Sequence, residues 1–164
     1  MEGIPLESKA KFVALTGIMA ALTAVATMII QIPTPQTRGY INLGDTMVML
    51  SGMLFGPVVG FLAGGLGSAA ADLLSGYAHW APFTLIIKGT EGAVVGLAYR
   101  RSSFFLLVAT VIAGFIMVAG YFTVEVFLYG FGGALAELPG NTFQAISGIV
   151  FANIVGRIIK KLIE

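Results

Sequence analysis

The chain has 164 residues, of which 57% are hydrophobic and 10% charged, and its mean hydropathy is +0.95. Soluble domains carry about 25% charged residues, so this composition excludes an ordinary soluble domain and predicts a membrane protein. Nine basic and eight acidic residues leave a net charge of +1, which is too balanced for a nucleic-acid-binding protein. The lack of cysteine excludes disulfides and thiolate metal sites.

The first apolar segment, at about 10–32, begins beside the basic residues Lys9 and Lys11. It resembles a signal peptide in this basic start and in Ala24-Val25-Ala26, which has the small-residue spacing of a cleavage site. The segment is longer than the apolar core of a signal peptide, and further apolar segments follow it. It is therefore predicted to be the first transmembrane helix.

The apolar stretch 46–71 could be one kinked helix or two shorter helices, because Gly56-Pro57 lies near its middle. Basic residues favour the cytoplasmic side of a membrane, and here they form three clusters. All three share one side only if an even number of crossings separates them, which requires a turn at Gly56-Pro57. The clusters are Lys9/Lys11, Arg100/Arg101 and Arg157/Lys160/Lys161.

The predicted fold is therefore all-α, a single membrane domain over residues 1–164 with both termini in the cytoplasm. Its six transmembrane helices are expected at about 10–32, 43–55, 57–75, 80–99, 103–129 and 138–161. Three loops would lie outside, at 33–42, 76–79 and 130–138, and they carry polar and aromatic residues. These residues would cover a binding cavity or, for Tyr77 and Trp80, form an aromatic belt at the membrane surface.

Small residues recur at four-residue spacing at Gly60, Gly64 and Ser68, and again at Gly92 and Gly96. This spacing lets transmembrane helices approach closely, so the helix at 57–75 is predicted to be central. The first helix has two such pairs, Gly17 with Ala21 and Ala20 with Ala24.

Four charged residues lie within the predicted spans, namely Asp72, Lys88, Glu91 and Glu125. A charged Asp, Lys or Arg at the centre of a span costs about 2.5–3.5 kcal/mol, so such residues usually have a partner or a function. Lys88 and Glu91 are three residues apart and share a helix face. They would form a structural ion pair, or line a polar cavity in which one of them meets a ligand.

Glu125 lies one turn after Tyr121 and close to the outer end of its helix. This carboxylate and phenol could bind the nitrogen, amine or hydroxyl groups of a heteroaromatic ligand. Asn141 and Gln144 occupy the matching end of the last helix, where they would bind ligand or cap the helix start. Asp45 is expected at the start of a helix, where the helix dipole favours an acid.

Motifs for chemistry are absent from the sequence. It has neither a phosphate-binding loop for ATP nor an H-E-x-x-H metal motif, and one histidine cannot form a histidine cluster. The chain is therefore predicted to be no enzyme, with no bound cofactor or metal, and to act in binding or permeation.

Six motifs follow one another along the chain, and a lone Gln144 comes after the last. They are 39–45 (GYINLGD), 54–60 (LFGPVVG), 64–72 (GGLGSAAAD), 87–92 (IKGTEG), 118–122 (VAGYF) and 137–141 (ELPGN). In this order they resemble the substrate-binding S components of energy-coupling-factor vitamin transporters. The resemblance is closest to the riboflavin-like branch that includes permeases for hydroxymethylpyrimidine, thiamine precursors and pyridoxine.

The resemblance implies six helices and a cavity in the outer half that binds a vitamin or a vitamin precursor. Riboflavin or another heterocycle, such as a queuosine precursor, is an alternative ligand. The residues implied to bind substrate are Lys88, Glu91, Tyr121, Glu125, Asn141 and Gln144, with Trp80, His79, Arg38, Tyr40 and Asn42 as lid or stacking groups.

The resemblance also implies partners in the plasma membrane. A small-residue patch on the first helix, either Ala20/Ala24 or Gly17/Ala21, would dock on a transmembrane coupling subunit. Two separate ATPase subunits would hydrolyse ATP while this chain binds ligand outside and releases it inside. From the residues alone, a self-contained pore or small exporter, or a scaffold with purely structural charges, remains an alternative.

Overall fold

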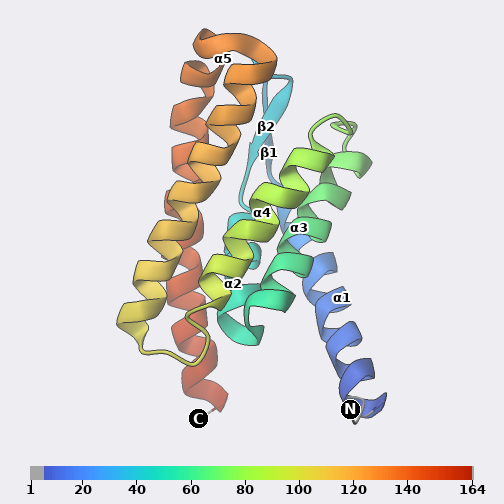
Figure 1. Cartoon of the computed structure of the whole chain (residues 1–164), viewed down its shortest axis with the longest axis vertical. Coiled ribbons are helices and arrows are strands. Elements are labelled where there is room, and N and C mark those ends of the chain that lie inside the picture. The colour runs from blue at the N-terminus through green and yellow to red at the C-terminus, as the bar shows by residue number, and fades with distance from the viewer. Residues whose placement is uncertain (1–5, 164) are drawn as a thin grey trace.

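The computed structural model describes residues 6–163, except for the side chains of residues 6, 7, 160 and 163. This part of the chain is mainly helical and contains one short β-hairpin (Figure 1). The helices are α1 (Leu6–Ile29), α2 (Asp45–Phe55), α3 (Pro57–Leu74), α4 (Ala81–Gly96) and α5 (Ser103–Ile163), and the strands are β1 (Gln31–Thr34) and β2 (Gly39–Asn42).

Helix α5 is bent back on itself at Gly130, where φ is 79° and ψ is 168°. Glycine adopts this conformation without the steric cost that a side chain would add. Figure 1 shows two antiparallel arms on either side of the bend, so the start of α1 and the end of α5 lie at the same end of the bundle. The predicted loop at 130–138 is wrong, because the chain is helical again directly after Gly130.

The hairpin is a second correction, because the fold is not purely α-helical. The first helix ends at Ile29 rather than at 32, and the predicted loop at 33–42 contains an antiparallel pair in which Ile32 faces Ile41. Pro33 and Pro35 explain the change, since a residue before proline is driven out of the helical region into extended conformations. Helix α4 likewise ends earlier than predicted, at Gly96.

The turn predicted at Gly56-Pro57 is confirmed. Gly56 has a φ of 88° and separates α2 from α3, and Pro57 begins α3, where a missing N–H costs nothing. The central place of α3 is also confirmed, since it packs against α1, α2 and α4. An added Cβ at Gly60 would lie 2.3 Å from the carbonyl oxygen of Gly92, so α3 and α4 pack backbone to backbone.

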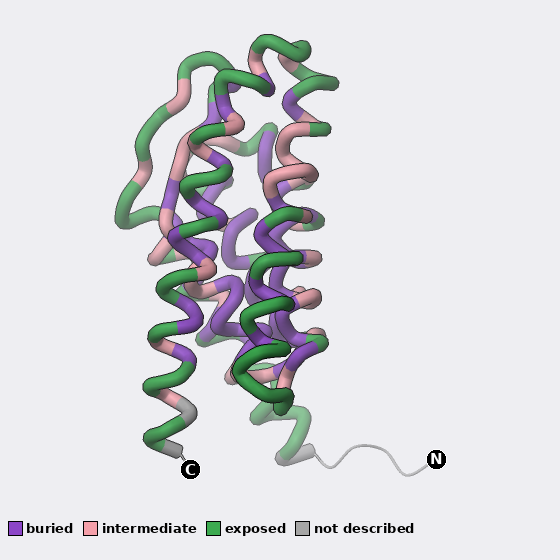
Figure 2. Tube along the Cα trace, turned by 90° about the vertical axis from the view of Figure 1, so that its left-hand side faces the viewer, coloured by how far each residue is buried: buried purple, intermediate pink, exposed green. Residues whose placement is uncertain are grey.

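Within the described residues, three helical segments are long and apolar enough to cross a membrane, namely Ser8–Ile29, Pro57–Leu74 and Ser103–Ile159, and the last is divided by the bend at Gly130. Helix α2 has 11 residues and covers about 16 Å, which is half of a 30 Å hydrocarbon core. Figure 2 shows buried residues concentrated inside the bundle and exposed residues on its outer faces. Many of these exposed side chains are large and apolar, as lipid contact requires. The six crossings and the cytoplasmic termini stay predictions.

Candidate functional site

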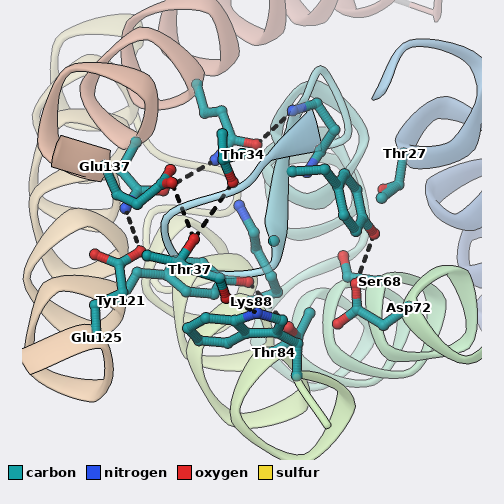
Figure 3. Close-up of a pocket in the computed structure, with 16 residues that line it drawn as sticks. Thr27, Thr34, Thr37, Ser68, Asp72, Thr84, Lys88, Tyr121, Glu125 and Glu137 are labelled. Atoms are coloured by element: carbon teal, nitrogen blue, oxygen red, sulfur yellow. Dashed lines mark hydrogen bonds between the residues drawn. The ribbon is translucent and has the colours of Figure 1, made fainter. Parts of the chain in front are cut away.

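A cavity lies between the hairpin, the end of α1, α3, α4 and the two arms of α5 (Figure 3). The hairpin and the bend of α5 lie at the end of the bundle away from the chain ends (Figure 1). The space between its side chains is about 470 Å³, including the part that opens to solvent. The structure brings eight of the eleven substrate-binding candidates together in its lining, namely Tyr40, Asn42, Trp80, Lys88, Tyr121, Glu125, Asn141 and Gln144.

The other three candidates lie elsewhere. Glu91 is fully buried behind the cavity, beside Lys88, and does not line it. His79 and Arg38 are exposed and also lie outside the lining, although the ring of His79 is 5.9 Å from that of Trp80. A direct contact of these three with a ligand therefore has no support from their positions.

The two arms of α5 form one wall of the cavity, and a chain of hydrogen bonds connects them. Asn141 Nδ2 donates to Glu125 Oε1 over 2.9 Å, and Gln144 Nε2 donates to Asn141 Oδ1 over 3.3 Å. Gln144 Oε1 in turn accepts the backbone N–H of Asn42 over 2.6 Å, which ties β2 to this wall. Asn141 lies inside the helix, so its alternative as a cap of the helix start is wrong.

The opposite wall is formed by α3 and the hairpin. The Tyr40 hydroxyl donates to Asp72 Oδ1 over 2.6 Å, which fastens β2 to the end of α3. Burial, and then the neighbouring Asp72 carboxyl, raise the pKa of the Tyr40 phenol above its ordinary value, so Tyr40 keeps the proton that it donates. Asp72 Oδ2 and the hydroxyls of Ser68 and Thr27 are buried without a hydrogen-bond partner in the described chain.

Lys88 lies at the inner side of the cavity and carries a buried ammonium. It forms an ion pair with Asp45 of α2, and its Nζ lies 3.5 Å from Glu91 Oε2. The Nζ is also 5.5 Å from the centre of the Tyr121 ring, a cation–π distance. The helix-dipole interpretation of Asp45 is therefore incomplete, because this carboxylate is mainly the partner of Lys88.

Trp80 forms the aromatic side of the cavity. Its ring is almost completely buried and lies 5.9 Å from the Tyr121 ring, edge to face, and its Nε1 donates to the carbonyl oxygen of Thr37 over 3.3 Å. The hydroxyl of Thr37 donates to Glu137 Oε1 over 2.9 Å. The hairpin is thus held over the cavity from α4 and α5, as Figure 3 shows. Trp80 therefore faces the cavity and not the outside of the bundle.

Several lining residues were not among the sequence-based candidates, namely Thr27, Thr34, Thr37, Gly39, Ser68, Asp72, Thr84 and Glu137. Most are short polar side chains, which are common at helix ends and in turns and therefore give no signal by themselves. Asp72 gave a signal only as a charge within a predicted span. In the folded chain it is 3% exposed.

The two docking candidates on α1 differ in exposure. Gly17 and Ala21 are exposed, whereas Ala20 and Ala24 are half-buried. The reason is the close approach of α3, since an added Cβ at Gly67 would lie 2.4 Å from the carbonyl oxygen of Ala20.

Taken together, the lining offers carboxylates, amides, hydroxyls and aromatic rings. Within residues 6–163, no group of three or more His, Asp or Glu residues is placed to hold a metal ion. Such a lining suits reversible binding of a small polar ring, so fold and site define a membrane-embedded binding protein.

Comparison with known proteins identifies the family. Residues 7–161 match the family described as ECF-type riboflavin transporter, S component. The chain is 34% identical to the thiamine precursor transporter HmpT of Lactococcus lactis, over 92% of this chain and 89% of that protein. A protein of Pyrococcus woesei is 50% identical over 85% of this chain and 95% of its own length. The chain therefore belongs to the S components of energy-coupling-factor (ECF) transporters, a family of transporter subunits and not of enzymes.

Solved structures share the fold. The structure of FolT bound with folic acid has a TM-score of 0.72 at 19% identity, covering 90% of this chain and 93% of that one. The S component for biotin from an ECF-type ABC transporter has a TM-score of 0.67 at 18% identity, covering 96% and 95%. At identities of 18% and 19%, these structures show that the fold is shared and nothing more.

Proposed function

We propose that this chain captures a thiamine-precursor-type heterocycle, such as hydroxymethylpyrimidine, in the cavity under the hairpin. The observation that carries the proposal is the buried lining, in which polar side chains surround an aromatic side formed by Trp80 and Tyr121. A flat ring would pack against Trp80 while its substituents reach Glu125 and Asp72 on the two walls.

Similarity over nearly the whole chain to a thiamine precursor transporter supports this ligand class over the riboflavin of the family description. Riboflavin, pyridoxine and other heterocycles, such as a queuosine precursor, are the alternatives that a binding panel tests.

The proposed orientation places the cavity outside and both termini in the cytoplasm of the cell. The start of α1, the turn between α4 and α5, and the end of α5 carry the basic clusters and lie at the end of the bundle away from the cavity (Figure 1). Basic segments favour the cytoplasmic side, which supports this orientation. Six crossings follow if α2, which is shorter than a full span, makes the second crossing.

The proposed partners are a transmembrane coupling subunit and two ATPase subunits that use the ATP. Exposure favours the Gly17/Ala21 face of α1 for docking, because the Ala20/Ala24 face is partly covered by α3.

Isothermal titration of the purified chain tests the proposal, with hydroxymethylpyrimidine, thiamine, pyridoxine and riboflavin as ligands. We expect binding of the pyrimidine at micromolar concentration or below. Thr123→Val is a matched control, since Thr123 lies on the exposed side of α5, two residues from Glu125. The ligand class would be abandoned if none of the four compounds bound.

A second measurement separates this function from a self-contained pore. Liposomes that contain this chain alone should show no flux of the bound ligand, because transport requires the ATPase subunits. Flux through such liposomes would support the pore and contradict the proposal.

A further inference from the structure

The positive charge of the cavity lining is neutralised by buried carboxylates, whereas the acidic groups of the lining lack a cationic partner in the described part of the chain. Lys88 is the one ammonium in the described lining, and Asp45 and Glu91 lie next to it on the side away from the cavity. All three side chains are at most 3% exposed. The positive charge of the lining is therefore neutralised from behind, by carboxylates that a ligand does not reach.

The carboxyls that face the cavity have no ion-pair partner among the described residues. Asp72 and Glu125 are each 3% exposed, and each has one oxygen, Oδ2 and Oε2 respectively, without a hydrogen-bond partner among the described residues. Figure 3 shows them on opposite sides of the cavity. A third carboxyl in the lining, that of Glu137, accepts the hydroxyl of Thr37.

We propose that Asp45 is a specificity-determining residue. It neutralises Lys88 from behind and leaves Asp72 and Glu125 to determine which ligands the cavity binds. These two carboxyls make the cavity accept a neutral or cationic ring with hydrogen-bond donors at both ends and reject anions. In its ionised form a carboxyl only accepts hydrogen bonds, so each free oxygen then pairs with a donor of the ligand. An anionic substituent would bring like charge next to a buried carboxylate, where charges interact strongly because little water screens them.

The role of Asp45 follows from its contacts. It does not line the cavity, and its Oδ1 bonds to Lys88 Nζ. Asparagine keeps the shape and the acceptor oxygen but removes the charge. In Asp45→Asn, Lys88 retains Glu91 as its acidic neighbour, at 3.5 Å. This variant therefore loses one acidic group beside Lys88, while the lining of its cavity is unchanged.

The inference rests on the proposed function and is tested with three aminopyrimidines that differ in one substituent at the same ring carbon. The substituent is hydroxymethyl, aminomethyl or carboxylate, so size is nearly constant while charge runs from neutral to positive to negative. Binding of each probe is measured by titration calorimetry on the whole chain in detergent. The proteins are wild type, Asp45→Asn, Glu125→Gln and the control Thr123→Val.

We expect wild type to bind the hydroxymethyl and aminomethyl probes at least 100-fold more tightly than the carboxylate. Asp45→Asn should reduce this ratio of affinities at least tenfold, and Glu125→Gln should weaken binding of the aminomethyl probe at least tenfold. Thr123→Val should change neither the ratio nor the binding of that probe. If wild type bound the carboxylate probe as tightly as the hydroxymethyl probe, the inference would be overturned. The proposed function would not be affected by that result. If no probe and no vitamin of the panel bound, the proposed function would be refuted.

If Asp45→Asn does not fold, the wild-type ratio and Glu125→Gln still decide whether the carboxyls of the lining select against anions. A folded Asp45→Asn with an unchanged ratio removes Asp45 from the specificity determinants and overturns the inference.

Discussion

The close packing of α2, α3 and α4 predicts a large effect of one added methyl group at Gly60. An alanine Cβ there would lie 2.3 Å from Gly92 O, 2.7 Å from Gly92 C and 2.8 Å from Gly52 Cα. Ordinary contact begins at about 3.4 Å, so α3 and its neighbours would have to separate by about 1 Å. All three atoms are backbone, and none can turn aside as a side chain would.

Overpacking of this kind costs about 1–3 kcal/mol, and a contact with rigid backbone belongs at the upper end. For a chain of this length, about 3 kcal/mol corresponds to a Tm lowered by about 6–12 °C. Thermal unfolding of Gly60→Ala in detergent measures the shift. The matched control is Gly17→Ala, where an added Cβ meets nothing within 4 Å and Tm should change by little. Equal Tm values for Gly60→Ala and wild type would refute the packing argument.

Three further predictions concern the site and its partners. Tyr40→Phe removes the bond to Asp72, a hydrogen bond to a charged group worth about 1.5–3 kcal/mol. Amide exchange in residues 31–42 should then become faster, and unchanged exchange would mean that this bond does not hold the hairpin. Lys88→Met leaves buried carboxylates unpaired and should cost about 3–5 kcal/mol of unfolding free energy. Adding Asp45→Asn to Lys88→Met should recover part of that loss, whereas simple additivity would contradict the pairing. Ala21→Trp should leave ligand affinity intact and abolish uptake by the assembled transporter, and normal uptake would exclude this face of α1.

The sequence predicted the parts of the fold that depend on local chemistry. Gly56-Pro57 identified the turn between α2 and α3, because glycine permits the positive φ and proline suits the first turn of a helix. Gly60 and Gly92 indicated close helix packing, since few other residues allow backbones to meet, although not that these two helices meet each other. Charge within an apolar segment made Lys88 and Glu125 candidates, because such charges require a partner or a polar environment, and both line the cavity.

The features that the sequence did not predict depend on contacts between distant segments. Asp45 and Lys88 are 43 residues apart, and the pairing becomes visible only when α2 lies against α4. The hairpin is stabilised by Asn42 and Tyr40 through partners on α5 and α3, so its own residues resemble an ordinary loop. The tight bend at Gly130 likewise depends on a single positive φ, which glycine permits but does not demand.

Packing and binding occupy different parts of this bundle. Glycines bring α2, α3 and α4 into backbone contact around Gly60, and no ligand-facing group is needed there. Around the cavity, by contrast, Thr27, Ser68, Asp72 and Glu125 keep buried polar atoms without partners. Such atoms are rare in folded proteins, because each unmet hydrogen bond costs about 1–3 kcal/mol. Four such atoms among the described residues line the cavity, where donor groups of a bound ligand would offset this cost, so bound ligand should stabilise the hairpin and both walls together.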